Sequence, residues 1–189
     1  MSGRLAGSLF SVFAMVLGFS SQAAAQTRRT DTAGDVSVVY SYMHDSSSKN
    51  FNGFRFSVAR NLSDSWALVV EAGADRNGSG VYRSSSGTHL YTYTDATVLG
   101  GVRLRRVDGS SSTPFFQVLG GYFGRRDGLT TDASFDGHFA VRTEVGVDLR
   151  MSDHAAFRFG GGWTFLGGGV RYMNQVGANA GFAYRFGRR

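Results

Sequence analysis

The strongest constraint in this sequence is an alternation of apolar with polar or small residues, which has a period of two and recurs eight times. In the segment 139–150 the odd positions are apolar apart from Thr143, whereas the even positions carry Ala, Gly and four charged residues. Successive side chains of a β-strand point to opposite faces, so this pattern predicts a strand with one apolar and one polar face. Similar segments lie at 36–42, 54–59, 66–73, 95–105, 116–122, 157–165 and 175–186. The sequence therefore predicts an all-β fold of eight strands.

The composition agrees with an ordered β-protein. Glycine supplies 27 of the 189 residues, about twice the usual share, and an interior glycine costs a helix about 1 kcal/mol relative to alanine. The single proline and the 14% aromatic content argue against a disordered chain. The absence of cysteine excludes disulfides, thiolate metal sites and a cysteine nucleophile.

The net charge of +6 does not by itself indicate a nucleic-acid partner. Only one of the 20 basic residues is a lysine, Lys49, and the arginines are dispersed along the chain. A nucleic-acid-binding domain concentrates its basic residues on one face. We therefore expect no nucleic-acid partner.

Residues 1–25 have the organisation of a signal peptide. Arg4 precedes an apolar stretch at 9–19, and small residues at 23–25 predict cleavage before Gln26. The alternative, an uncleaved membrane anchor, is disfavoured because this stretch is too short to cross a hydrocarbon core of about 30 Å. Residues 26–189 are then expected to form a single barrel domain, with strands between about 33 and 187.

The chemistry of the two strand faces distinguishes a membrane barrel from a soluble one. A soluble barrel buries its bulky apolar residues, whereas a membrane barrel turns them outward to lipid. Here the polar face combines Gly and Ala with Arg, Glu and Asp, a mixture that fits the narrow interior of an eight-stranded barrel. The sequence thus predicts an eight-stranded antiparallel up-and-down transmembrane β-barrel in the cell outer membrane.

The connections between the predicted strands alternate in length. Short turns are predicted at 61–64 and 151–153, and a somewhat longer one at 107–112. Between them lie predicted loops at 45–50, 76–88, 126–137 and 167–173. Outer-membrane barrels have short periplasmic turns and longer extracellular loops, so we expect these four loops to lie outside the cell.

The final part of the last predicted strand, Asn179–Phe186, resembles the carboxyl-terminal assembly signal of bacterial outer-membrane barrels. Its signal residues are Gly181, Phe182, Tyr184 and Phe186. Together with 99–103 and 114–121, this strand resembles the outer membrane protein β-barrel domain family over about 33–187. The resemblance implies an eight-stranded barrel whose partners are outer-membrane lipid and the barrel assembly machinery. In this chain Gly187, Arg188 and Arg189 follow the terminal aromatic residue of the signal.

Charged residues on the polar faces form the candidate site. They are Arg55, Glu71, Asp95, Arg103, Arg142, Glu144, Asp148, Arg158 and Arg185. One interpretation is a selective channel lined by arginines. The other is a plug of ion pairs, which we favour because an eight-stranded interior is only wide enough for side chains to fill it.

The sequence offers no convincing catalytic, cofactor-binding or metal site. Glu144 and Asp148 lie about 13 Å apart along one strand, too far to act on a single bond. The four histidines, His44, His89, His138 and His154, all fall at predicted strand ends. Asp45 and Ser46 follow His44, but a catalytic triad is recognised by its geometry and not by adjacency in sequence.

These observations predict a non-enzymatic, monomeric outer-membrane barrel with a largely plugged lumen. Its role would be in envelope structure or in surface interaction through the extracellular loops, and the sequence does not identify the extracellular ligand. Two alternatives remain open at this stage, an outer-membrane lipid-modifying hydrolase and a narrow anion-preferring pore.

Overall fold

The computed structural model describes residues 32–77, 80–84, 87–106, 111–127, 136–167 and 173–187. The predicted signal peptide, 1–25, lies outside the described residues and stays a prediction. Among the described residues, no helix is long and apolar enough to cross a membrane.

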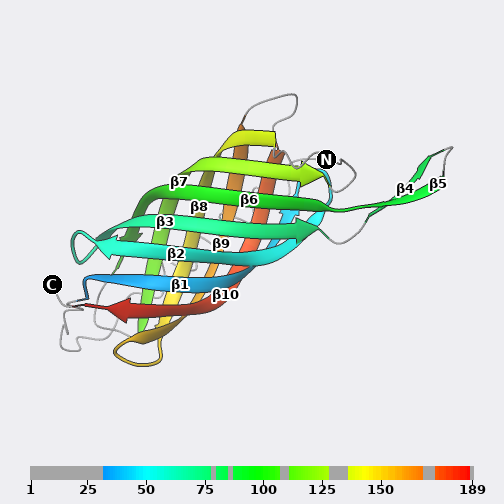
Figure 1. Ribbon diagram of the computed structural model, residues 1–189. Coiled ribbons are helices and arrows are strands. Elements are labelled where there is room, and N and C mark those ends of the chain that lie inside the picture. Colours follow the sequence, from blue (N-terminus) through cyan, green and yellow to red (C-terminus); the bar gives the residue numbers. More distant parts are fainter. Residues whose placement is uncertain are drawn as a thin grey trace, which may run out of the picture.

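Eight strands close into one antiparallel barrel (Figure 1). They are β1 (Gly34–Asp45), β2 (Asn50–Asn61), β3 (Trp66–Asn77), β6 (Tyr93–Arg105), β7 (Ser112–Asp127), β8 (Asp136–Arg150), β9 (Ala155–Gly167) and β10 (Met173–Phe186). Around the barrel their order is β1-β10-β9-β8-β7-β6-β3-β2, so each strand pairs with its neighbour in the chain and β10 closes onto β1. The predicted eight-stranded, antiparallel, up-and-down topology is confirmed.

The predicted loop at 76–88 is in part a hairpin. β3 extends to Asn77, and β4 (Gly80–Ser84) pairs with β5 (Gly87–Tyr91) in a separate two-stranded sheet. This arm projects from one end of the barrel (Figure 1). The loop prediction was wrong here because the arm strands do not alternate: Val81 is followed directly by Tyr82, and Leu90 by Tyr91. His89, predicted at a strand end, lies within β5.

The two ends of the barrel differ in their connections. At the turn end, 62–65, 106–111 and 151–154 join the strands, and Gly34 of β1 lies opposite Phe186 of β10. At the loop end lie 46–49, the arm, the end of β7 at Asp127, the start of β8 at Asp136, the end of β9 at Gly167 and the start of β10 at Met173. The backbone amide of Ala33 donates to the carbonyl of Phe186 at 3.0 Å, so both ends of the described chain lie at the turn end.

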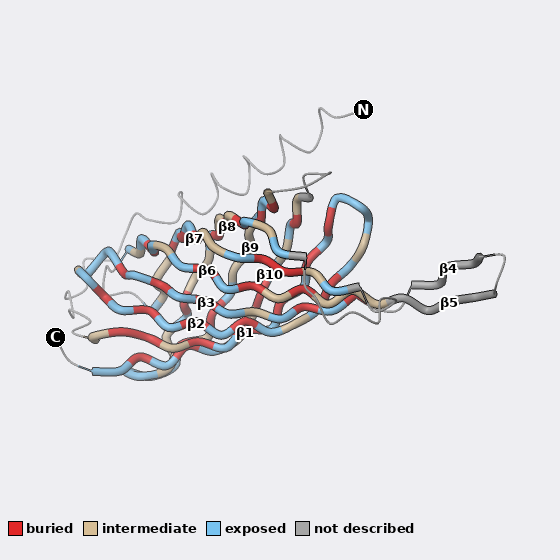
Figure 2. Tube along the Cα trace, turned by 45° about the horizontal axis from the view of Figure 1, so that its top comes forward, coloured by how far each residue is buried: buried red, intermediate tan, exposed pale blue. Residues whose placement is uncertain are grey.

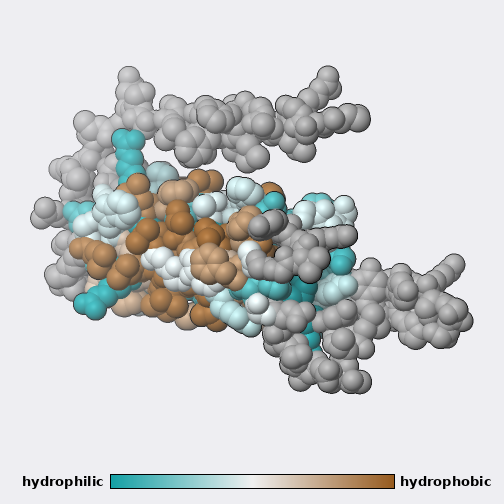
Figure 3. All heavy atoms as spheres, turned by 90° about the horizontal axis from the view of Figure 1, so that it is seen from above, coloured by the Kyte–Doolittle hydropathy of each residue, from teal (hydrophilic) through white to brown (hydrophobic). Residues whose placement is uncertain are grey.

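Burial alternates along the strands as predicted (Figure 2). Large apolar residues cover the outside of the barrel, and Phe54, Val70 and Phe139 are each at least 60% exposed. The inward positions combine charged residues with a smaller apolar cluster of Ala59, Ala67, Val69, Leu99, Leu119, Phe123, Ala140 and Leu166. In a space-filling view the apolar surface covers the middle of the barrel, and hydrophilic residues lie toward its ends (Figure 3). The barrel is therefore polar inside and apolar outside.

Candidate functional site

All nine charged residues singled out from the sequence lie inside the barrel, and none is more than 7% exposed. Asp35, Asp45, Asp75 and Arg125 also point inward, although they were not part of the predicted charge network. Each of these four has the same parity as the inward residues of its strand, so the alternation pattern contains the signal that identifies them. The inward charges group into three clusters along the barrel.

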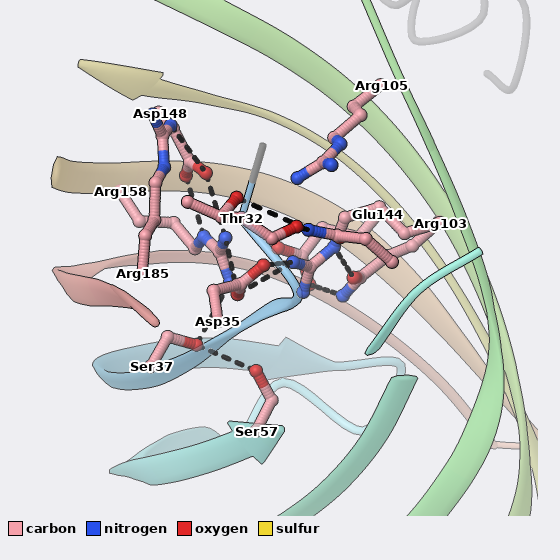
Figure 4. A network of polar contacts seen from close by, with 12 residues as sticks. Thr32, Asp35, Ser37, Ser57, Arg103, Arg105, Glu144, Asp148, Arg158 and Arg185 are labelled. Carbon is pink, nitrogen blue, oxygen red and sulfur yellow. Dashed lines mark hydrogen bonds and ion pairs between the residues drawn. The ribbon is translucent and has the colours of Figure 1, made fainter. Parts of the chain in front are cut away.

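The turn-end cluster comprises Asp35, Arg103, Asp148, Arg158 and Arg185 (Figure 4). Arg158 donates to both carboxylate oxygens of Asp148, from Nε at 2.7 Å and from Nη2 at 2.8 Å. The same guanidinium reaches Asp35 at 3.1 Å, and Arg103 approaches Asp35 at 3.1 Å from the other side. Arg185 lies 3.8 Å from Asp148. The two-bond contact between Arg158 and Asp148 combines charge-assisted hydrogen bonds, which are roughly twice as strong as neutral ones.

The middle cluster comprises Arg55, Glu71, Arg142 and Glu144. Arg142 pairs with Glu71, and its Nε donates to the Thr164 hydroxyl at 2.9 Å. Arg55 lies 4.0 Å from Glu144. The Gln117 side chain connects this cluster to the turn-end cluster, because it accepts from Arg103 at 2.9 Å and donates to Glu144 at 3.2 Å.

The loop-end cluster comprises Asp45, Asp75, Asp95 and Arg125. Arg125 binds both oxygens of Asp95 at 2.7 Å and lies 3.6 Å from Asp45. Gln175 donates to Asp95 at 3.1 Å, and the Ser41 hydroxyl donates to Asp75. The arginine is also stacked near the Phe51 ring, with its guanidinium carbon 4.8 Å from the ring centre.

Several of these contacts join strands that lie opposite one another in the barrel. In the order around the barrel, β2 and β8, β1 and β7, and β6 and β10 are each four positions apart. Arg55–Glu144, Asp45–Arg125 and Asp95–Gln175 join these three pairs of strands. The lumen is therefore spanned by side chains in the middle and at the loop end, as expected for an interior of this width.

The clusters together hold seven carboxylates and six arginines. The carboxylates are Asp35, Asp45, Glu71, Asp75, Asp95, Glu144 and Asp148, and the arginines are Arg55, Arg103, Arg125, Arg142, Arg158 and Arg185. The numbers of opposite charges are nearly equal over the whole lumen, although the turn-end cluster has one more arginine than carboxylates and the loop-end cluster has three carboxylates to one arginine. This arrangement can hold the register of the strands, and it does not resemble a ring of unpaired arginines.

The predicted assembly-signal residues alternate across the wall of the barrel. Phe182, Tyr184 and Phe186 point outward and are 39–59% exposed, whereas Gly181 points inward. A Cβ atom at Gly181 would collide with the carbonyl oxygen of Val38 on β1, so close approach of β1 and β10 requires glycine here. The role of this strand in assembly stays a prediction.

The described residues bring no catalytic constellation together. Glu144 belongs to the middle cluster and Asp148 to the turn-end cluster. Nδ1 of His44 lies 2.7 Å from the Asn50 side chain, while His138 stacks on Phe123 and His154 packs edge-on against Tyr184. No group of three or more potential metal ligands occurs in the part of the chain that the structure describes.

Comparison with solved structures identifies the fold. It is that of the small eight-stranded outer-membrane β-barrels. Neisserial surface protein A superimposes with a TM-score of 0.61 at 14% identity, over 81% of this chain and 96% of that protein. The outer membrane protein OprG of Pseudomonas aeruginosa gives 0.55 at 13% identity, over 82% and 97%. Ail, the attachment invasion locus protein of Yersinia pestis, gives 0.51 at 11% identity, over 82% and 97%.

The sequence comparisons add nothing to this result. No protein-family model matches the chain, and no curated protein matches it. Because the identities to the solved structures are low, the likeness concerns the fold alone.

Proposed function

We propose that this chain is an integral outer-membrane β-barrel with a plugged lumen, which acts non-enzymatically in the envelope or at the cell surface. The observation that carries the proposal is the inverted polarity of the barrel. Arginines, carboxylates and a smaller apolar cluster fill the inside, while large apolar residues, with some Ala and Gly between them, form a belt on the outside. Soluble monomers rarely expose more than a few hundred Å² of contiguous apolar surface, so the belt supports a lipid environment.

Aromatic residues near both ends of the belt support this interpretation. Trp66 and Tyr184 lie outward near the turn end, and Tyr42 and Tyr122 lie outward near the loop end, each 45–52% exposed. Aromatic side chains at these heights match the girdles that membrane barrels place at the two lipid–water interfaces. The predicted signal peptide and the short turns suggest an orientation with the turn end in the periplasm and the loop end outside.

The ion-pair clusters favour a plug over the anion-preferring pore. An anion pathway needs arginines that are free to attract anions, whereas Arg125, Arg142 and Arg158 each contact a buried carboxylate. With the lumen filled, the arm and the connections at the loop end are the parts available to a partner outside the cell. The three histidines whose side chains the structure describes, His44, His138 and His154, contact asparagine and aromatic side chains, which gives the hydrolase alternative no support.

The first experiment tests insertion and the plug together. We expect the purified chain to fold in detergent or lipid, to migrate differently on gels before and after heating, and to give no stable conductance in planar bilayers. The double variant Arg55→Ala/Glu144→Ala removes one contact that spans the lumen, and we expect more frequent conductance from it. Large stable conductance from the parent protein would contradict the plug, and a parent protein that folds only in the absence of lipid and detergent would contradict insertion.

A second experiment tests the non-enzymatic assignment. Lipid extracts from cells that express the chain are compared by mass spectrometry with extracts from cells that express His44→Ala/His154→Ala. We expect the two extracts to be identical. Loss of acyl groups from outer-membrane lipid in the parent strain alone would show hydrolysis.

A further inference from the structure

One patch on the outer wall near the loop end combines unpaired positive charge with an apolar groove. Arg76 of β3, Thr94 of β6 and Arg126 of β7 are consecutive cross-strand partners and therefore form a row on the outside. Both arginines are exposed, and among the described residues their side chains have no hydrogen-bond or ion-pair partner. This contrasts with the arginines of the lumen, which are paired.

The spacing of the row suits an anionic headgroup. Adjacent strands lie about 4.8 Å apart, so the backbones of Arg76 and Arg126 are separated by about 10 Å. The two long arginine side chains can extend toward each other along the outer wall, and the Thr94 hydroxyl lies between them as a further donor. Arginine forks match phosphate oxygens in a bidentate manner.

A groove of about 340 Å³ lies directly beside this row, toward the middle of the barrel. Tyr40, Phe54 and Ala74 line its apolar part, and Asn52, Arg76 and Thr94 line its polar edge. Tyr40 and Phe54 pack edge to face, with ring centres 5.5 Å apart, and the Tyr40 hydroxyl donates to Asn52 at 2.9 Å. These contacts hold one wall of the groove in place.

The groove is open on its other side because the next residues are small. Ala74 is paired with Ala96, and Ala96 with Gly124. The side chains on this side of the groove are therefore much smaller than the two aromatic rings on the other side. Such a trough along the apolar belt fits an acyl chain of a neighbouring lipid. The same belt is seen as the apolar middle of the surface in Figure 3.

From this arrangement we propose that the patch is a binding site for a phosphorylated glycolipid of the outer leaflet. An acyl chain lies in the groove beside Phe54 and Ala74, while phosphates bind Arg76 and Arg126. Two arginines about 10 Å apart, with a hydroxyl between them, suit a headgroup with two phosphates better than a single phosphodiester. The inference rests on the proposed orientation, in which the loop end faces out of the cell.

The test measures lipid binding to the refolded full barrel in detergent by native mass spectrometry. The probes are lipid A with two phosphates, lipid A with both phosphates removed, phosphatidylglycerol and inorganic pyrophosphate. We expect bis-phosphorylated lipid A to bind at least tenfold more tightly than each of the other three probes. The double variant Arg76→Gln/Arg126→Gln should lose about tenfold or more of that affinity, since each charge-assisted bond is worth more than a neutral one.

A charge-matched control separates this site from general electrostatics. Arg60→Gln/Arg106→Gln removes two exposed arginines at the turn end and should leave lipid A affinity unchanged. Equal loss in both double variants, or equal binding of phosphatidylglycerol or pyrophosphate, would overturn the site. Ala74→Phe, which fills the groove, should weaken binding of lipid A but not of pyrophosphate.

Failure of this inference is distinguishable from failure of the proposed function. Heat-modifiable gel mobility is measured on every variant before lipid is added. A barrel that folds, shows this mobility and yet does not discriminate between the lipids would refute the glycolipid site alone. A chain that fails to form the heat-modifiable species would refute the membrane barrel itself.

Discussion

Replacing Arg158 with methionine tests how much the turn-end cluster contributes to the stability of the barrel. Arg158 is 3% exposed and makes two bonds to Asp148, one to Asp35 and one to the Ser37 hydroxyl. After the substitution, Asp148 keeps only Arg185 at 3.8 Å, while Asp35 keeps Arg103. Removing one partner of a buried ion pair costs about 3–5 kcal/mol, because the remaining charge is left without compensation.

Methionine keeps an apolar chain in place of the arginine stem but removes the guanidinium, whose carbon lies 5.1 Å from the centre of the Phe115 ring, so the loss reports on the ion pairs together with this cation–π contact. The assay is urea unfolding in detergent, followed by the fluorescence of Trp66 and Trp163 and by gel mobility. We expect the free energy of unfolding to fall by about 3–5 kcal/mol for Arg158→Met.

A double-mutant cycle with Asp148→Asn separates the interaction energy of the Arg158–Asp148 pair from the other contributions of the two side chains. The two changes together should cost at least about 1 kcal/mol less than the sum of the single changes, because they remove the same interaction. Arg60→Met, an exposed position at the same end, should change stability by no more than about 0.5 kcal/mol. Strict additivity in the cycle, with a loss below about 1 kcal/mol for Arg158→Met, would refute a stabilising ion-pair plug.

Two other predictions concern the belt and the arm. Val145→Arg places a charge on the outer face of β8 and should make the free energy of folding in lipid about 2–4 kcal/mol less favourable, whereas Val145→Thr should fold. Equal folding yields of the two variants would exclude lipid contact at this position. Deletion of 79–87 should leave heat-modifiable mobility unchanged, because β4 and β5 form a sheet separate from the barrel; loss of the folded species on deletion would show that the arm supports the barrel.

The strands and their faces were predictable because the period of two is a local property of the chain. In β8 the parity alone assigned Arg142 and Glu144 to the inside and Val145 to the outside, as the structure has them. The same rule would have assigned Asp45 and Arg125 to the lumen. They were missed because the predicted segments ended at 42 and 122, before the strands end.

Which arginine binds which carboxylate was not predictable from the sequence. The partners depend on the stagger of the strands and on which strands face one another across the lumen, and neither quantity is local. Arg55 and Glu144 are 89 positions apart in the chain, yet β2 and β8 lie opposite one another. The arm was missed for a different reason, since its two strands place apolar residues next to each other and so show no period of two.

The last prediction concerns Phe186, where structural and assembly demands coincide. Phe186 lies opposite Gly34, accepts a hydrogen bond at its carbonyl from Ala33 and is 39% exposed on the outer wall at the turn end. Its backbone bonds survive substitution, so Phe186→Ala should lower the stability of the purified barrel by no more than about 1–2 kcal/mol. If the ring is also part of the signal that assembly machinery reads, the amount of folded protein in the outer membrane should fall far more than this stability loss explains.

Fractionation with heat-modifiable mobility measures the amount of folded Phe186→Ala in the outer membrane, and urea unfolding of the purified variant measures its stability. Removal of Arg188 and Arg189, which lie beyond the strand, is the control and should not reduce assembly. Normal accumulation of Phe186→Ala, together with failure of the truncated chain, would place the assembly information in the basic tail instead of the aromatic strand end.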